Sequence, residues 1–264
     1  MLAMMTKIRH TDDIWGGKAT GGFRMGVYSN TEILQAVKDD IIVCTPFNPD
    51  NVSEASLDFT LGHYFYKQEY SEYSRVYNPF DEADVARYFK GPLEAMPHAE
   101  WCERYHVREL FNNISPEHPI IVLKPGERIL THTHEFVGIR AEGGAAEVKS
   151  RSSWGRNGVA VCFDAGWVDP GYINRITLEI YNLNQHESVV LPVGERIGQL
   201  IFHHTGKVDG DYTTGRSGMS GKYQHTSDLN ELIASWRPEM MLPRAFKDKR
   251  RTPDTIDGLT GGMK

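Results

Sequence analysis

Residues 147–182 bring together serines, arginines and acids that are suited to hydrolytic chemistry. The run 151–156 holds serines and arginines, an acid begins the turn Asp169-Pro170-Gly171, and Glu179 lies within the apolar run 176–181. Proline and glycine in this order predict a sharp turn, and the β-branched and aromatic neighbours of Glu179 predict a strand. A buried carboxylate is costly unless it is paired, hydrogen-bonded or used in chemistry, so Glu179 is the first candidate for a catalytic residue.

The surroundings predicted for Glu179 favour a role in proton transfer. A carboxylate whose pKa is lifted towards neutrality by burial can take a proton from an attacking water and return it to a leaving group. An apolar strand supplies that burial. A glutamate in such a place can also form a structural ion pair with an arginine, and the residue types alone leave both interpretations open.

A series of sequence blocks resembles the dCTP deaminase branch of the dUTPase-like family. The blocks are residues 46–47, 55–62, 151–158, 165–172, 176–179, 194–200 and 221–224. In that family the glutamate after Thr-Leu separates deaminases from pure dUTPases, and Glu179 stands at this position. The resemblance implies a mainly β fold, a distorted jelly-roll or β-sandwich of the dUTPase-like type with a few peripheral helices, which assembles as a homotrimer.

The resemblance also implies catalytic residues for the deamination of cytosine. Glu179 would be the base, and Ser152 together with the backbone carbonyl of Ala165 would hold the attacking water. Arg156 would lie close to Glu179, where it restrains the carboxylate and offsets developing charge. The family uses no metal at C4 of the base, so we expect no zinc.

Other positions in these blocks are implied to bind the triphosphate. Arginine forks and hydroxyl donors suit phosphate oxygens, and the candidates are Arg151, Ser153 and Gln199. Lys222 and Tyr223 join them from a C-terminal segment that closes over the triphosphate in the family. Magnesium is expected to arrive with the nucleotide rather than to sit in a protein cage.

The turn at Asp169 is implied to recognise the deoxyribose. Asp169 would accept the sugar 3′-hydroxyl, and Tyr172 would pack on the sugar where a 2′-hydroxyl would clash. The chain departs from the family at Asn174, where glycine is usual, and at His225-Thr226, where a Gly-Gln pair is usual. We expect Asn174 to keep the turn, because asparagine tolerates a positive φ better than most residues.

The 264 residues are enough for one large domain with additions. We expect a glycine-rich arm over 1–26, a β domain over 27–224 with an insertion over about 67–117, and an extension over 225–264. The extension includes a basic tail over 244–251, for which a solvated state is the ordinary expectation. Helices are predicted over residues 31–37, 81–89, 99–110 and 228–236.

Two histidine patterns invite a metal interpretation. His98-Ala99-Glu100, near Cys102, gives the H-x-E of zinc-dependent deaminases, but the sequence has no P-C-x-x-C to complete the site. His132 and His134 would point to one face of a predicted strand. A solvated or subunit-facing role is favoured for this pair because no third ligand is apparent, and we predict no protein metal site.

Composition argues against several classes of function. The net charge of −6 gives no broad basic surface, which disfavours a dedicated nucleic-acid binder. No apolar run approaches the ~20 residues of a membrane helix, and the early charges do not fit a signal peptide. Three widely spaced cysteines favour the reducing cytoplasm over a disulfide framework.

These features lead to three functional hypotheses. The leading one is hydrolytic deamination of dCTP to dUTP and ammonia, followed by cleavage to dUMP and pyrophosphate. The second step is included because Ala165-Gly166-Trp167 before Asp169 resembles the bifunctional members. The alternatives are a dUTP or dCTP pyrophosphatase without deamination, which Glu179 argues against, and a nucleotide-sensing regulatory protein.

Overall fold

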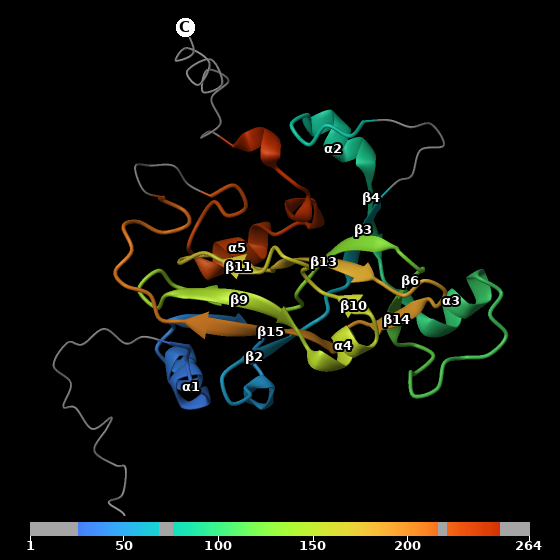
Figure 1. The fold of residues 1–264 in the computed structure, drawn as a ribbon, viewed down its shortest axis with the longest axis horizontal. Coiled ribbons are helices and arrows are strands. Elements are labelled where there is room, and N and C mark those ends of the chain that lie inside the picture. The colour runs from blue at the N-terminus through green and yellow to red at the C-terminus, as the bar shows by residue number, and fades with distance from the viewer. Residues whose placement is uncertain (1–25, 69–75, 216–220, 249–264) are drawn as a thin grey trace, which may run out of the picture.

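Antiparallel sheets form most of the fold in the part of the chain that the computed structural model describes, residues 26–68, 76–215 and 221–248 (Figure 1). One has five strands, β10 (Val159–Ala160), β13 (Thr177–Asn182), β7 (Arg128–His132), β3 (Tyr64–Gln68) and β4 (Phe89–Glu94). Another has four, β11 (Trp167–Val168), β9 (Ala145–Ser150), β15 (Arg196–His203) and β2 (Leu57–Thr60). A third sheet has three strands, β1 (Ile42–Thr45), β8 (Phe136–Ile139) and β12 (Ile173–Asn174). A fourth sheet also has three, β14 (Val189–Pro192), β6 (Pro119–Leu123) and β5 (Met96–Pro97). The predicted mainly β class is confirmed.

The main core determines which way Glu179 points. Leu178 and Ile180 are both 0% exposed and belong to the largest hydrophobic cluster among the described residues. Successive side chains of a strand point to opposite faces, so Thr177, Glu179 and Tyr181 of β13 point the other way. The alternation therefore places the carboxylate on the face of the five-stranded sheet that turns away from this core.

Three of the predicted helices form where side chains cap their first turns. They are α1 (Asn30–Lys38), α2 (Glu82–Tyr88) and α5 (Leu229–Ser235). Ser29, Asp81 and Asp228 each accept a hydrogen bond from a backbone N–H of the turn that follows. These predictions are confirmed. Short 3₁₀ turns are η1 (Pro49–Asn51), η3 (Pro238–Met241) and η4 (Ala245–Lys247).

The helix predicted over 99–110 is shorter than expected, and α4 (Ser152–Arg156) was not predicted. α3 spans His98–Arg104 and ends because His106 adopts a left-handed φ of 57°. In α4 the five helical residues are too few to show an apolar periodicity in the sequence. The predicted 99–110 boundary is therefore wrong at its C-terminal end.

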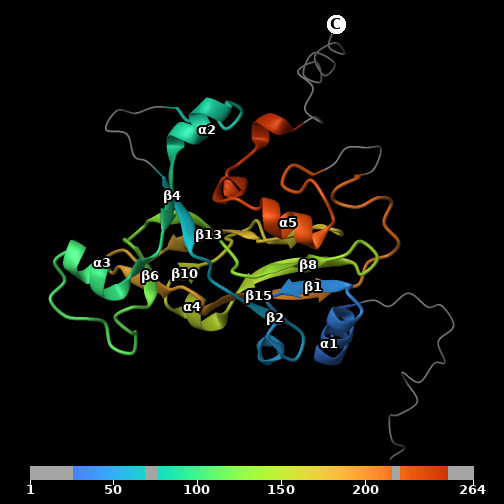
Figure 2. The same cartoon turned by 180° about the vertical axis from the view of Figure 1, so that it is seen from behind.

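The predicted insertion and the C-terminal extension pack together beside the five-stranded sheet. β4 of the insertion pairs with β3 and so widens the sheet that carries Glu179. Val85 and Phe89 of the insertion share a hydrophobic cluster with Leu130 and with Met241 of the extension. Figure 2 shows α2 and the C-terminal segment on the same side of the sheets. Two segments far apart in sequence thus form one small apolar core.

The expectation of two histidines on one strand face is wrong. β7 ends at His132, which is 0% exposed, whereas His134 lies beyond the strand and is exposed. His132 Nε2 accepts from the N–H of Tyr64 (3.2 Å), and Nδ1 donates to the carbonyl of Thr133 (2.8 Å). Burial lowers the pKa of His132 to about 3, so it is a neutral core residue.

The remaining boundaries stay predictions. The arm over 1–26 lies outside the described residues except for Gly26. The basic tail is not simply solvated where it is described, because Arg244 donates from NH1 to the carbonyl of Lys222 (2.9 Å). Helices of the length and apolarity that a bilayer crossing needs do not occur within the described ranges.

Candidate active site

Glu179 combines burial with an unsatisfied carboxylate oxygen. It lies opposite Leu130 in the pairing of β13 with β7. Its Oε2 atom is buried and has no hydrogen-bond partner among the described residues. Burial raises the pKa of Glu179 from 4.5 to about 7, and the guanidinium of Arg128 offsets this only in part. Near neutral pH the carboxyl therefore populates both the protonated and the ionised form, as proton transfer requires.

A cavity of about 380 Å³ lies beside Glu179. Leu130, Val148 and Ile176 give it apolar walls, and Arg128 and Thr177 add polar groups. The structure brings five of the sequence-predicted residues to this cavity. They are Ala165, Asp169, Tyr172, Glu179 and Tyr223.

The turn at Asp169 has the sharp geometry that the sequence predicted. The N–H of Tyr172 donates to the carbonyl of Asp169 (3.0 Å), and Gly171 has a φ of +85°. A Cβ at Gly171 would lie 2.8 Å from Cβ of Asp211, so both backbone and space require glycine. Trp167 Nε1 donates to Asp169 Oδ1 (3.1 Å) and so orients the carboxylate at the cavity rim.

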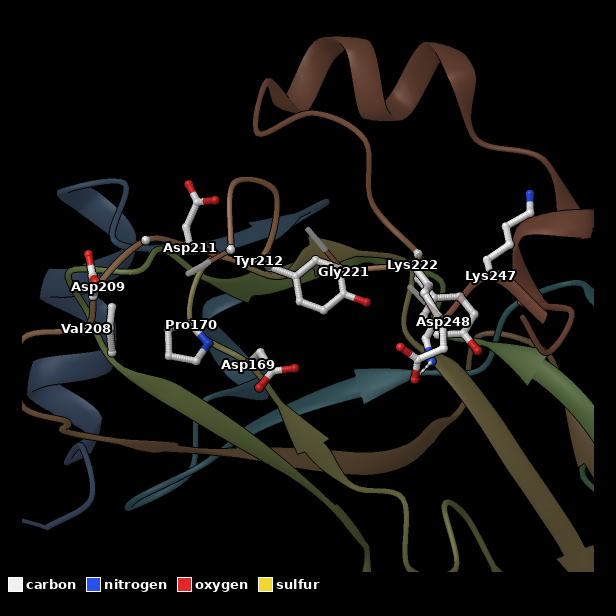
Figure 3. Close-up of a pocket in the computed structure, with 13 residues that line it drawn as sticks. Asp169, Pro170, Val208, Asp209, Asp211, Tyr212, Gly221, Lys222, Lys247 and Asp248 are labelled. Atoms are coloured by element: carbon white, nitrogen blue, oxygen red, sulfur yellow. Dashed lines mark hydrogen bonds and ion pairs between the residues drawn. The ribbon is translucent and has the colours of Figure 1, made fainter. Parts of the chain in front are cut away.

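A second cavity of about 600 Å³ adjoins the first. Asp169, Tyr212 and Tyr223 line both, and Lys222 lines the second. Figure 3 shows Asp169 and Tyr212 on one side of this space and Lys222 with Asp248 on the other. Lys222 Nζ lies 3.4 Å from Asp248 Oδ2. The two cavities together give Glu179 and Lys222 a shared, continuous surface.

Residues 221–224 are tied to the turn by the buried side chain of Gln224. Its Oε1 accepts from the N–H of Ile173 (2.7 Å), and its Nε2 donates to the carbonyl of Gly171 (3.1 Å). Asn174 Nδ2 donates to the carbonyl of Tyr223 (3.2 Å). The turn is kept with Asn174 in the place of glycine, as expected, but the reason expected for it does not apply, because Asn174 lies in β12 and has no positive φ. Its amide instead holds the 221–224 segment.

The other sequence-predicted residues form a second group, which we call the α4 group: Arg151, Ser152, Ser153, Arg156 and Gln199. Ser152, Ser153 and Arg156 are exposed on α4, and none lines the cavity at Glu179. Figures 1 and 2 both place α4 on the side of the fold away from α5. The expected approach of Arg156 to Glu179 is therefore not made within one chain.

Two members of the α4 group have partners of their own. Arg151 Nε lies 3.1 Å from Asp58 Oδ2, and Arg196 NH1 reaches the same oxygen at 3.1 Å. Asp58 is 2% exposed, and its burial raises its pKa against the two arginines, which lower it. Ser56 Oγ donates to Gln199 Oε1 (3.2 Å). Arg151 thus has a structural task beside any contact with phosphate.

Several cavity residues were missed by sequence reasoning. Arg128 is the charged neighbour of Glu179, and its NH1 donates to the hydroxyl of Tyr181 (2.8 Å). Met241 and Pro243 reach the cavity from the C-terminal extension. Arg128 lies at the start of a predicted strand. The alternation of side chains along that strand could therefore have predicted that Arg128 is on the same face of the sheet as the cavity. The extension carries no such signal, because only tertiary packing brings it there.

The site thus combines a half-buried glutamate and an Asp-Pro-Gly turn at one cavity of a mainly β fold. The family model described as dCTP deaminase-like matches residues 27–205. The chain belongs to this family, and the resemblance seen in the sequence blocks is confirmed. The matched range ends before the 221–224 segment and the C-terminal extension.

The chain is similar to two named relatives and to one solved structure. It is 31% identical over 183 residues to the "dCTP deaminase, dUMP-forming" of Methanopyrus kandleri, across 68% of this chain and 82% of that protein. It is 32% identical over 178 residues to the "dCTP deaminase" of Haloarcula marismortui, across 67% of this chain and 79% of that protein. The structure of 2′-deoxycytidine 5′-triphosphate deaminase from Agrobacterium tumefaciens matches with a TM-score of 0.47 and 20% identity, across 69% of this chain and 49% of that one.

Proposed function

We propose that this chain deaminates dCTP hydrolytically, with Glu179 as the base. The observation that carries the proposal is the half-buried carboxyl at the cavity, with its Oε2 buried and unpartnered among the described residues. The relatives in Methanopyrus kandleri and Haloarcula marismortui, both named dCTP deaminases, support the choice of substrate. A pyrophosphatase that left the base unchanged would have no use for a proton-transfer group at this place.

In the proposed mechanism Glu179 moves every proton of the exchange at C4. It accepts a proton from water as the water oxygen bonds to C4, and passes that proton to ring N3. It then accepts the proton of the new C4 hydroxyl and passes it to the amino nitrogen, so the C4–N bond breaks and ammonia leaves uracil. A pKa of about 7 serves both directions of transfer. The carbonyl of Ala165, on the cavity wall, orients the water.

We infer that Ser152 and Arg156 reach Glu179 from a second copy of the chain, in the homotrimer that the family resemblance implies. Both residues are exposed and absent from the cavity of their own chain. Phe163 and Trp167 are 71% and 59% exposed, and Trp167 lines the Glu179 cavity. The exposed ring of Trp167 at this cavity is consistent with contact to another copy of the chain.

The nucleotide would span the two adjoining cavities. With cytosine at Glu179, Asp169 is placed to accept the 3′-hydroxyl and Tyr172 to pack on the sugar. The triphosphate would then run towards Lys222 and Tyr223. Arg151, Ser153 and Gln199 of the partner copy would complete its binding site with donors that suit phosphate oxygens.

The described residues fit a magnesium ion that is held mainly by the nucleotide. Within them there is no group of three His, Cys, Asp or Glu side chains placed to hold a metal. Asp211 Oδ1 accepts from the hydroxyls of Thr213 (2.7 Å) and Thr214 (2.9 Å), and Asp248 pairs with Lys222. Such an ion keeps phosphate oxygens and water as ligands. When bound, it neutralises charge on the triphosphate.

We propose that the deamination needs no zinc. His98 of the H-x-E pattern is 0% exposed, its Nε2 accepts from the N–H of Phe111 (2.9 Å), and its Nδ1 donates to the carbonyl of Ile114 (3.3 Å). Both ring nitrogens thus serve the fold around α3. A zinc-selective chelator should leave ammonia release intact, and a loss of activity that added zinc restores would contradict the proposal.

We further propose that the product is dUMP with pyrophosphate, as in the relative from Methanopyrus kandleri, which is named as dUMP-forming. Asp169 would orient a second water behind the α-phosphorus. The test of the whole function is to incubate dCTP with magnesium and to follow ammonia together with phosphorus NMR. Ammonia with dUMP is the expected result. Persistent stoichiometric dUTP would remove the second step, and no ammonia would overturn the deaminase.

We propose that the protein acts in the cytoplasm. Cys44, Cys102 and Cys162 are all free thiols. Free, widely separated thiols are typical of proteins in a reducing compartment. The expected partners are the nucleotide and further copies of the chain, with no nucleic acid or membrane.

A further inference from the structure

The C-terminal extension reaches both candidate cavities. Met241 and Pro243 line the cavity at Glu179, and Lys247 and Asp248 line the adjoining one. Arg244 stands between these two pairs and turns towards the 221–224 segment. The extension is therefore part of the walls, although it lies outside the range that the family model matches.

We propose that Arg244 is a positioning residue, which holds Lys222 and Tyr223 in the geometry that receives the triphosphate of the substrate. The proposal rests on the proposed function, because it assigns the adjoining cavity to the phosphates. Arg244 itself need not touch the nucleotide. It acts through the two residues of the 221–224 segment that were expected to do so.

Arg244 makes three contacts with that segment. Its NH1 donates to the carbonyl of Lys222 (2.9 Å), and its backbone N–H donates to the hydroxyl of Tyr223 (3.1 Å). Its guanidinium carbon lies 5.7 Å from the centroid of the Tyr223 ring, within cation–π range. One residue thus fixes the backbone of Lys222 and both the ring and the hydroxyl of Tyr223.

The 221–224 segment needs such a contact because it has no helix or strand of its own. Gln224 anchors its C-terminal end, and the N–H of Gly221 donates to the carbonyl of Tyr212 (2.7 Å) at the other end. Between these anchors, Lys222 and Tyr223 would lose conformational entropy on binding a triphosphate. A contact that fixes them beforehand removes that loss from the binding step.

Arg244 can do this because its own backbone is fixed. Met241, three residues before it, is 3% exposed in the hydrophobic cluster with Val85 and Phe89 of the insertion and Leu130 of β7. The insertion therefore has a structural purpose in this arrangement. It supplies the apolar platform on which the extension docks, and the extension presents Arg244.

Three variants test the proposal. Arg244→Ala removes the guanidinium, and Arg244→Lys keeps a cation with a donor in place of the planar fork. Arg237→Ala is the matched control, because Arg237 lies in the same extension and its NH1 donates to the carbonyls of Ala234 and Trp236, away from Lys222. Each variant is assayed for kcat and KM in ammonia release from dCTP. Deuterium uptake of residues 221–228 is measured without nucleotide.

The expected result for Arg244→Ala is a KM for dCTP raised about tenfold with kcat changed less than about threefold, as loss of a charge-assisted hydrogen bond predicts. Its deuterium uptake at 221–228 should rise. Arg244→Lys should fall between Arg244→Ala and the wild type in both measurements, and Arg237→Ala should match the wild type. In a Lys222→Ala background, Arg244→Ala should add less than its effect alone, because part of that effect is the positioning of the Lys222 side chain, which this background lacks.

Two outcomes would overturn the proposal. One is unchanged deuterium uptake and KM in Arg244→Ala, and the other is an equal rise in Arg237→Ala, which would mean general loosening of the extension. If Arg244→Ala does not fold, a wild-type KM in Arg244→Lys with additivity in the Lys222→Ala background would also overturn it. Failure of the proposed function is seen separately, as no ammonia from the wild type, and the deuterium exchange then still decides whether Arg244 orders residues 221–228.

Discussion

Glu179 shows how a strand can hold an acid at a useful pKa. The residues on either side, Leu178 and Ile180, are fully buried in the core, so the position of Glu179 along β13 is fixed. Its own side chain points to the other face, into a cavity with apolar walls and a single nearby arginine, Arg128. Burial disfavours the ionised form more than a hydrogen bond from the backbone and the charge of Arg128 together favour it. The pKa of about 7 follows from this balance.

Replacing Glu179 with glutamine should remove the proposed base and keep its shape. General acid–base catalysis contributes about a hundredfold or more to rate, so ammonia release by Glu179→Gln should fall by at least about a hundredfold. Binding of dCTP should stay within about tenfold, because glutamine preserves the cavity volume. Steady-state ammonia release and calorimetric binding check the two parts. Turnover above a tenth of the wild-type value would show that Glu179 is not the base.

The raised pKa of Glu179 also makes a prediction about stability. The folded chain holds this proton up to about pH 7, whereas the ordinary pKa of the group is 4.5. The folded state thus binds more protons in this window, and the free energy of unfolding contributed by Glu179 falls as pH rises from about 4.5 to 7. The full shift corresponds to at most about 3 kcal/mol. The Glu179→Gln variant has no carboxyl at this position, so its free energy of unfolding should not show this fall between about pH 4.5 and 7.

Denaturant unfolding of the wild type and of Glu179→Gln at pH 5 and pH 8 checks this prediction about stability. Relative to the wild type, Glu179→Gln should gain stability between the two values. An equal difference at pH 5 and pH 8 would mean that the carboxyl is already ionised at pH 5, and it would contradict a pKa of about 7 for Glu179.

At the level of elements, local signals in the sequence predicted what is local in the structure. The capped helices α1, α2 and α5 and the turn at Asp169 follow from residue types within a few positions of each other. The end of α3 did not, because it depends on the left-handed backbone of His106, a conformation that histidine adopts more often than most residues but still in a small minority of cases. The burial of His132 depends on packing against Gly62 and Tyr64 of a distant segment.

The 221–224 segment is the element whose placement was least predictable. Its attachment uses Gln224 and Asn174, two amides whose side chains bond to backbone groups about fifty residues away in sequence. In the sequence, Asn174 was interpreted as a replacement for a turn glycine. Its hydrogen bond to the 221–224 segment can be recognised only in the structure, where β12 lies beside that segment. Single polar side chains of this kind form no periodic pattern in the sequence, so their hydrogen-bond partners cannot be predicted from it.

Gln224→Met should loosen this segment without changing the volume much. Methionine cannot accept from Ile173 or donate to Gly171, so two buried backbone groups lose their partner. The expected cost is about 1–3 kcal/mol in unfolding free energy, with a raised KM for dCTP. Chemical denaturation and steady-state kinetics measure the two effects. The same substitution at Gln35, which is exposed on α1, is the control, and equal effects at both positions would contradict a role for the Gln224 bonds.

For the whole molecule, the sequence named the candidate residues but did not predict how the fold of one chain divides them in space. Ser152 and Arg156 come shortly before the blocks 165–172 and 176–179, which do meet at the cavity, yet α4 presents them to solvent elsewhere. A linear pattern cannot distinguish residues that meet within one chain from residues that meet across an interface. The structure separates the two groups within one chain, and in the assembly of copies that we propose they would meet.

Mixed trimers test this division directly. Glu179→Gln lacks the base but keeps α4 intact, and Arg156→Ala keeps the base but alters α4. Arg156 is chosen over Arg151 because Arg151 pairs with buried Asp58, so its removal would also destabilise the fold. If each site joins the cavity of one copy to α4 of the next, refolding the two variants together at equal amounts restores about a quarter of the wild-type sites. Either variant refolded alone should stay inactive.

Ammonia release from dCTP is the readout, with light scattering to confirm a trimer. Folded variants mixed without subunit exchange are the control, and they should give no recovery. A co-refolded trimer that also gives none would mean that each copy carries its own complete site, and light scattering that shows an active monomer would lead to the same conclusion.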